Sequence, residues 1–222
     1  MIPSADAQSV DELHSGVGHA FSAQGPLARA VPGFSARASQ AEMAEAIAAT
    51  IAARGTLVAE AGTGTGKTFA YLVPALLAGG KVLVSTGSKP LQDQLYAKDL
   101  PAVRAALGVN ASTALLKGRA NYLCLLRLER TEAQGRLASR EEAFHLREIL
   151  RFSRLTLSGD RAELAAVPEH ASIWPAVTST RDNCLGAECP RLQECFVFKA
   201  RRDAQAADVV VVNHHLFLAD LA

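Results

Sequence analysis

The chain has 222 residues, 49% of them hydrophobic, and a formal net charge of +1. This length allows one or two domains, and the near-neutral charge excludes a global basic field, so any surface for nucleic acid has to be local. No apolar stretch reaches the ~18 residues of a membrane span, and the N-terminus lacks the basic and apolar regions of a secretory signal, which predicts a cytoplasmic protein without a membrane partner.

The first part of the chain changes character near Ser39. Residues 1–33 mix polar residues, glycine and proline without a sustained period, so we expect a leader with at most one short helix. From Ser39 onward, apolar residues at intervals of four predict a helix over 40–53 with one buried stripe. Ser39 is the expected cap, because Glu42 follows it at capping-box spacing.

A glycine-rich loop follows the apolar stretch 56–59, which we predict to be a strand. Residues 61–68 read A-G-T-G-T-G-K-T, the P-loop pattern with Ala61 in place of the first glycine. The glycines permit positive φ, so the loop can turn its N–H groups inward and, with the helix behind it, bind phosphate. We predict that Lys67 reaches the β- and γ-phosphates and that the Thr68 hydroxyl holds Mg²⁺. A chance Gly/Thr-rich turn is disfavoured because strand-like and helical segments flank the loop. The predicted nucleotide-binding residues of the loop are Ala61, Gly62, Thr63, Gly64, Thr65, Gly66, Lys67 and Thr68.

The segments after the loop alternate between helix and strand patterns. A helix is expected from residue 67 to about 77, kinked at Pro74, and 81–85 is a second apolar strand. A helix between two strands implies a right-handed βαβ unit in a parallel sheet. The β-branched run 209–212 is typical of a buried central strand. We further expect a helix at 91–96, a strand at 113–116, a helix at 141–154 and irregular structure over 155–183.

Four cysteines form a second chemical signal. They are Cys124, Cys184, Cys189 and Cys195, the last three spaced C-x4-C-x5-C among loop-forming residues. Four thiolates without a well-placed histidine suit either a tetrahedral Zn²⁺ or an iron–sulfur cluster. The spacing is less typical of zinc, because zinc ribbons usually supply two close C-x2-C pairs. Four unrelated buried thiols are the third interpretation.

Six motifs carry a resemblance to a known family. They are P-G-F-S-A-R-A-S-Q from Pro32, E-A-G-T-G-T-G-K-T from Glu60, S-T-G-S-K-P-L-Q-D-Q-L-Y from Ser85, L-L-K-G-R-A-N-Y-L-C ending at Cys124, D-N-C-L-G-A-E-C-P from Asp182 and V-V-V-V-N-H-H-L-F-L-A-D from Val209. Together they resemble the XPD-like iron–sulfur helicases of superfamily 2, in the DinG/YoaA branch and its YoaA members most. This resemblance favours a 4Fe–4S cluster on the four cysteines.

The resemblance implies an α/β fold: a RecA-like P-loop parallel sheet flanked by helices, with an inserted, mainly helical and loop iron–sulfur cluster domain. It implies a leader (1–33), a first RecA-like helicase lobe (34–118) with Q-type motif, Walker A and motif Ia, the iron–sulfur domain (119–200), and a return to the lobe (201–222). The family places an Asp-Glu-Ala-His motif shortly after this point, and the sequence stops at Ala222. We therefore expect an N-terminal fragment that does not hydrolyse ATP or unwind DNA by itself.

The resemblance also implies residues that contact adenine and DNA. The implied adenine contacts are Arg37 and Gln40; the implied contacts with DNA phosphates are Thr86, Gly87, Ser88, Lys117 and Arg119. Surface polar pairs and an ordinary turn are the alternatives for these positions. Trp174 is expected in the core rather than stacked on a base, and His214 and His215 are expected to pack or to position a loop rather than to bind a metal.

The intact protein is expected to be an ATP-dependent 5′→3′ DNA helicase, a hydrolase that uses ATP and Mg²⁺. Its substrates would be single-stranded DNA and duplex junctions in DNA repair or replication, and a C-terminal region would meet replication or repair proteins. A hypothesis from a different class is a nucleotide-binding module with a structural zinc site made of the four cysteines, acting as a partner or regulator without unwinding. Iron colour, with absorbance near ~400 nm, separates the two.

Overall fold

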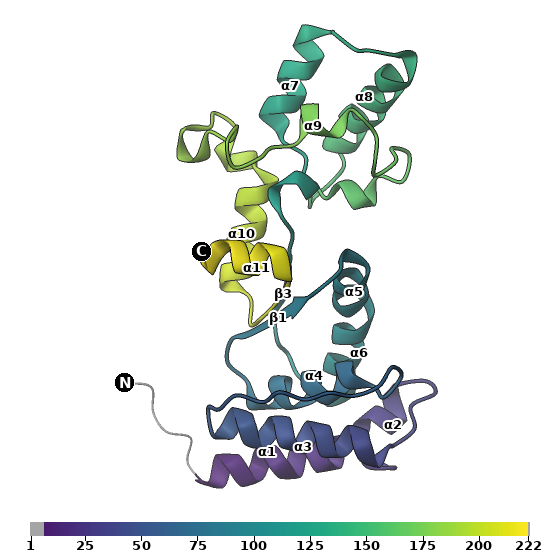
Figure 1. Cartoon of the computed structure of the whole chain (residues 1–222), viewed down its shortest axis with the longest axis vertical. Helices are drawn as coiled ribbons and strands as arrows, with labels where there is room; N and C mark the ends of the chain where they lie inside the picture. The colour runs from purple at the N-terminus through teal and green to yellow at the C-terminus, as the bar shows by residue number, and fades with distance from the viewer. Residues whose placement is uncertain (1–6, 222) are drawn as a thin grey trace. The chain divides into compact units, whose positions relative to one another are not determined.

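The computed structural model describes residues 7–221, which form two compact units (Figure 1). Unit 1 comprises the described residues up to Ala114 together with Ala207–His215, and unit 2 comprises Leu115–Ala206 and the residues after His215. The chain leaves unit 1 near the predicted boundary at 118 and returns to it near the predicted boundary at 201.

Unit 1 combines helices with a parallel sheet. Its helices are α1 (Ala7–Ala20), α2 (Pro26–Ala30), α3 (Ala38–Ala52), α4 (Lys67–Ala78), α5 (Lys89–Gln94), the π-helix η1 (Leu95–Asp99) and α6 (Leu100–Leu107). The strands are β1 (Val82–Thr86), β2 (Thr113–Leu116) and β3 (Val209–Asn213), after which α11 (His214–Leu221) begins. The order β1-β3-β2 and the parallel pairing of β1 with β3 confirm the predicted α/β class. No helix among the described residues is long and apolar enough to cross a membrane.

The central strand is β3. Its register with β1 pairs Val82 with Val209, and all four valines of β3 are buried, as the β-branched run predicts. Immediately before β3, the Asp208 carboxylate accepts hydrogen bonds from the Ser112 hydroxyl at 2.6 Å and the Ser112 N–H at 2.7 Å. These hydrogen bonds, the hydroxyl first, hold the pKa of the Asp208 carboxyl below its usual range. The contact links β3 to the segment that enters β2.

This contact predicts a pH-dependent effect of Asp208→Asn on the free energy of unfolding. Because the folded-state pKa of Asp208 is depressed, its stabilisation is present above the unfolded value of 3.8 and is lost as pH falls through the lower folded value. Urea unfolding should show Asp208→Asn to be less stable at neutral pH, with a difference that shrinks below about pH 4. The exposed Asp203 in α10 supplies the matched control, Asp203→Asn, and a pH-independent difference for Asp208→Asn would contradict this role.

The expectation of at most one short helix within residues 1–33 is wrong, because the described residues of this segment form α1 and α2. Helix α1 packs against α3, as Figure 1 shows, and Val17 and Leu27 have no exposed surface. Apolar residues recur along α1 at helical spacing, but Gly16 and Gly18 lie between them, and glycine has low helix propensity. Burial against α3 outweighs this local weakness.

Two local predictions next to the phosphate loop also fail. Residues 56–59 are irregular and exposed rather than a strand, with Val58 95% exposed. An apolar run becomes a strand only where a neighbour accepts its backbone hydrogen bonds, and none of the strands in the described residues pairs with it. Helix α3 begins one residue before Ser39, after Arg37, and no side chain caps it.

The helix predicted from residue 67 to about 77 is α4, which continues past the buried Pro74 to Ala78.

Unit 2 is mainly helical with irregular connections. Its elements are η2 (Arg119–Asn121), α7 (Leu125–Gln134), α8 (Arg140–Ser153), η3 (Arg161–Glu163), α9 (Trp174–Val177), η4 (Gly186–Glu188), η5 (Leu192–Glu194) and α10 (Phe196–Ala206). The elements η2 to η5 are short 3₁₀ helices, unlike the π-helix η1. Helix α8 and the irregular segment after it confirm the predictions for 141–154 and 155–183, apart from the short helices η3 and α9.

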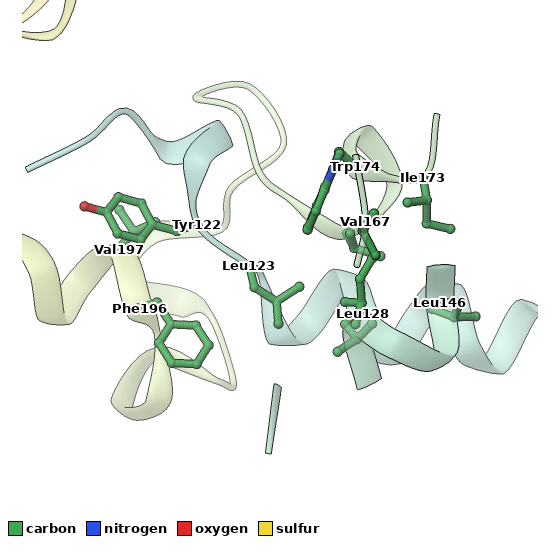
Figure 2. Close-up of a cluster of buried hydrophobic side chains, with 11 residues drawn as sticks. Tyr122, Leu123, Leu128, Leu146, Val167, Ile173, Trp174, Phe196 and Val197 are labelled. Atoms are coloured by element: carbon green, nitrogen blue, oxygen red, sulfur yellow. The ribbon is translucent and has the colours of Figure 1, made fainter. Parts of the chain in front are cut away.

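A separate hydrophobic core holds unit 2 together. Figure 2 shows Leu123 from the segment before α7, Leu128 from α7, Leu146 from α8 and Trp174 from α9 within this cluster. Trp174 is 2% exposed, and its Nε1–H donates to the Pro168 carbonyl at 2.8 Å. Its indole is therefore a core side chain, as expected, and is not presented to a base.

Candidate functional site

The glycine-rich loop of unit 1 adopts a conformation that its glycines require. Gly64 has φ 76° and Gly66 has φ 82°, values at which other residues are strained. A Cβ on Gly66 would lie 2.0 Å from Nε2 of Gln40, so a side chain there would displace the Gln40 amide that bonds the loop. The Thr65 hydroxyl donates to the Gly62 carbonyl at 3.0 Å and closes the loop. Helix α4 begins directly after it, so the free N–H groups of the first helical turn adjoin the loop.

Lys67 extends into the curve of this loop. Its Nζ donates to the carbonyls of Ala61 and Gly62, both at 2.7 Å. Two neutral carbonyls therefore hold the ammonium inside the loop, and a charged phosphate would be a stronger acceptor than either.

The hydroxyl of Thr68 is hydrogen-bonded to Tyr71, one helical turn further along α4. Burial raises the pKa of Tyr71, the Thr68 hydroxyl opposes this rise, and the nearby Asp99 adds to it. To hold Mg²⁺, Thr68 would have to exchange Tyr71 for the ion. Sequence reasoning missed Tyr71 and Asp99, although the spacing of three residues from Thr68 places Tyr71 on the same face of α4.

A cavity of about 310 Å³ lies beside the loop. Its lining residues are Val31, Pro32, Gly33, Phe34, Ser35, Arg37, Gln40, Gly64, Thr65, Gly66, Thr68, Phe69, Gln94 and Asp99. The Arg37 guanidinium donates to the Gly64 carbonyl, and the Gln40 amide donates to the Gly66 carbonyl at 2.8 Å. The two residues predicted to contact adenine therefore lie at this cavity and brace the phosphate loop; Gln40 is only 5% exposed.

The predicted DNA contacts of unit 1 lie at the carboxyl end of β1, where parallel sheets commonly bind ligands. Thr86 donates to the Ser88 carbonyl at 3.3 Å, and Ser88 caps α5 by accepting from the Leu91 N–H at 3.4 Å. His214, which follows β3, lies 2.5 Å from the Ser85 hydroxyl through Nδ1, and its ring adjoins Gly87. His214 thus contacts the segment that carries Thr86, Gly87 and Ser88, in agreement with a loop-positioning role.

The four cysteines lie at the ends of short elements in unit 2. Cys124 precedes α7, Cys184 lies in a loop, and Cys189 and Cys195 follow η4 and η5. All four are half-buried and free of disulfides. Burial raises the pKa of the Cys124 thiol, a hydrogen bond from the Arg127 backbone opposes the rise, and the charges of the other three cysteines add to it. The fold thus brings Cys124 into the electrostatic range of three residues at least sixty positions away in the sequence.

Arg119 approaches this group of thiols, which sequence reasoning missed. Its Nη1 donates to Cys184 Sγ at 3.2 Å. Among the described residues, no group of three or more His, Cys, Asp or Glu side chains has the geometry of a metal-ion site.

Lys117, one of the predicted DNA contacts, is buried and paired in this structure. Lys117 is 7% exposed, and its Nζ forms an ion pair with Asp160 at 2.7 Å. Its backbone N–H donates to the Tyr122 hydroxyl at 3.0 Å. The ammonium of Lys117 therefore forms an ion pair with a buried carboxylate in unit 2 and is not presented to a phosphate. A buried charge without such a partner would destabilise the fold.

Comparisons with known proteins agree with the interpretation of residues 61–68 as a P-loop. Residues 38–133 match the DEAD/DEAH box helicase family. The chain is 53% identical over 201 residues to the ATP-dependent DNA helicase YoaA of Escherichia coli and 50% identical over 206 residues to that of Haemophilus influenzae, covering 90% and 93% of this chain. It is 38% identical over 216 residues to the ATP-dependent helicase DinG of Mycobacterium tuberculosis, covering 87% of this chain. The chain spans about a third of each relative, 32% of its length.

Proposed function

We propose that the chain forms part of an ATP-dependent DNA helicase, because its residues 38–133 match the DEAD/DEAH box helicase family and it is similar to YoaA and DinG. The observation that carries the proposal is the loop after residue 61, with Lys67 turned into its curve, in a chain whose relatives are named ATP-dependent helicases.

Unit 1 would bind ATP and Mg²⁺, in what would be the first RecA-like lobe. The loop N–H groups and Lys67 would neutralise the phosphates, and Thr68 would hold Mg²⁺. Arg37 and Gln40 line the adjoining cavity and would contact the adenine. Through their hydrogen bonds to the carbonyls of Gly64 and Gly66, binding of the adenine would affect the position of the loop. Catalysis of phosphoryl transfer rests on such positioning and charge stabilisation.

Unit 2 would hold a 4Fe–4S cluster through its four cysteines. A set of donors made only of thiols, all in unit 2, supports this assignment. Arg119 would keep its hydrogen bond to Cys184 beside the cluster. When bound, the cluster would tie the loops around Cys184, Cys189 and Cys195 to the start of α7.

The substrate would be single-stranded DNA next to a duplex junction, with movement 5′→3′ and a role in DNA repair or replication. Thr86, Gly87 and Ser88 would contact the strand, and unit 2 would act as a wedge at the junction. Replication or repair proteins are the proposed partners. The four free thiols support a reducing compartment such as the cytoplasm.

Unwinding assays on a full-length protein that contains this chain test the proposal. Duplexes with a 5′ or a 3′ single-stranded tail separate the two polarities, and ATP hydrolysis is followed with and without single-stranded DNA. We expect unwinding of the 5′-tailed duplex only, and DNA-stimulated hydrolysis that is lost in Lys67→Ala. Normal unwinding by the Lys67→Ala protein would refute the assignment of the loop.

A further inference from the structure

The exposed face of α8 in unit 2 carries a stripe of arginines that none of the sites above uses. Arg140, Arg147, Arg151 and Arg154 are all exposed and recur at helical spacing. Placed at 100° per residue, they fall within about 60° of the helix circumference. The buried residues of α8 lie opposite: His145, Leu146 and Ile149. The stripe is therefore directed away from the core of unit 2.

Phe144 interrupts this stripe with an exposed aromatic ring. It lies between Arg140 and Arg147 at helical spacing, on the same face, and is 45% exposed. At the other end, a cavity of about 290 Å³ is lined by Arg147, Leu150, Arg151, Arg154 and Leu155. From residue 140 to residue 154 the stripe extends about 21 Å along the helix axis, at 1.5 Å per residue.

The charge of the stripe is largely uncompensated. In the described part of the chain no ion pair involves Arg140, Arg147 or Arg154. Arg151 has one partner, Glu148 at 3.7 Å, with the arginine side chain 75% exposed. Such an exposed pair contributes little stability, so a phosphate can replace the glutamate.

We propose that this stripe, Arg140, Phe144, Arg147, Arg151 and Arg154, is a binding site for the backbone and bases of single-stranded DNA. The inference rests on the proposed function for the choice of DNA as the anion. Arginines along a face bind successive phosphates, and an exposed aromatic ring between them stacks on an unpaired base. Single-stranded DNA fits better than duplex DNA, because the bases of a duplex are already stacked and leave Phe144 without a partner.

Fluorescence anisotropy with a labelled oligothymidylate of about 20 nucleotides and a duplex of equal length tests the site on the whole 222-residue chain. The variant Arg147→Ala/Arg151→Ala/Arg154→Ala should bind the single strand at least ~10-fold more weakly near 100 mM salt, and its log–log salt slope should fall by about 2, since three phosphate contacts are lost. The control variant Arg130→Ala/Arg201→Ala/Arg202→Ala removes the same charge from exposed positions elsewhere in unit 2 and should change neither.

A second pair of variants isolates stacking from charge. Phe144→Ala should weaken single-strand binding about 5- to 10-fold at an unchanged salt slope, and Phe144→Tyr should retain it. Leu157→Ala, which truncates another exposed apolar side chain of unit 2, should have no effect. Circular dichroism confirms that each variant is folded.

The outcomes separate this inference from the proposed function. If the unchanged chain binds single-stranded DNA and the triple arginine variant binds it equally well, the stripe is overturned and the proposed function is untouched. Tighter binding of the duplex, lost in the triple variant, would overturn the assignment to a single strand. If the unchanged chain binds neither probe, the stripe is wrong, and the unwinding assay on the full-length protein still decides the proposed DNA substrate.

Discussion

Asp160→Ala is expected to lower the free energy of unfolding of unit 2 by about 3–5 kcal/mol, because it removes the buried carboxylate that pairs with the buried ammonium of Lys117. The two side chains are 6% and 13% exposed and lie 2.7 Å apart. Asp160 also caps η3 by accepting from the Ala162 N–H at 3.0 Å, which adds to the loss. Urea unfolding followed by the fluorescence of the buried Trp174 measures the effect in this unit.

A double variant distinguishes the loss of the Lys117–Asp160 ion pair from the loss of the Asp160 side chain itself. Lys117→Met/Asp160→Leu replaces both charges with apolar groups and should recover most of the stability, since a buried pair often gives little net stabilisation over apolar residues. Asp203→Ala at an exposed position should be neutral. An Asp160→Ala protein as stable as the unchanged chain would show that Lys117 and Asp160 are not a buried pair.

Lys67→Ala is expected to weaken binding of ATP·Mg²⁺ by roughly 10- to 100-fold. Hydrogen bonds to charged groups contribute about 1.5–3 kcal/mol, and each 1.4 kcal/mol corresponds to about a factor of ten in affinity. The substitution removes an ammonium whose position inside the loop is defined by two carbonyls at 2.7 Å. Titration with a fluorescent ATP analogue measures the affinity.

Lys98→Ala is the matched control for Lys67→Ala, since Lys98 is exposed in η1 of the same unit and lies outside the cavity. It removes one lysine charge and should leave the affinity unchanged. Equal affinities for the unchanged chain and Lys67→Ala would show that the loop does not bind the nucleotide.

Elements whose residue pattern reports burial directly could be predicted from the sequence. The β-branched run of β3 allows little besides a buried strand, and the apolar residues of α8 recur at helical spacing. The strand β2 matches its predicted bounds, Thr113–Leu116. These patterns are local, so they need no knowledge of the partner.

Elements that depend on a distant partner could not be predicted in this way. The apolar residues 56–59 read as a strand, but strand formation depends on a neighbouring strand. Helix α1 is stabilised by its packing against α3, which the glycine-containing sequence of residues 7–20 does not announce. Lys117 reads as an exposed cation, and only the fold brings Asp160 to it.

The candidate site likewise consists of residues that a local sequence pattern identifies and of contacts that only the fold creates. The phosphate loop is contiguous, so its residues could be identified from their order alone. The contacts that Arg37 and Gln40 make with it, and the approach of Arg119 to Cys184, arise from segments far apart in the chain. The arginine stripe of α8 has a signal in its helical spacing, but this spacing belongs to no phosphate-loop or metal-ligand motif.

The most direct test of the account is the metal content of unit 2, because it separates an iron–sulfur helicase from a zinc-bearing nucleotide-binding module. The chain is purified without oxygen, and iron, acid-labile sulfide and zinc are measured together with the visible spectrum. The account predicts about four irons and four sulfides per chain with absorbance near ~400 nm, all lost in Cys184→Ser. A colourless chain with one tightly bound zinc and no iron would contradict it.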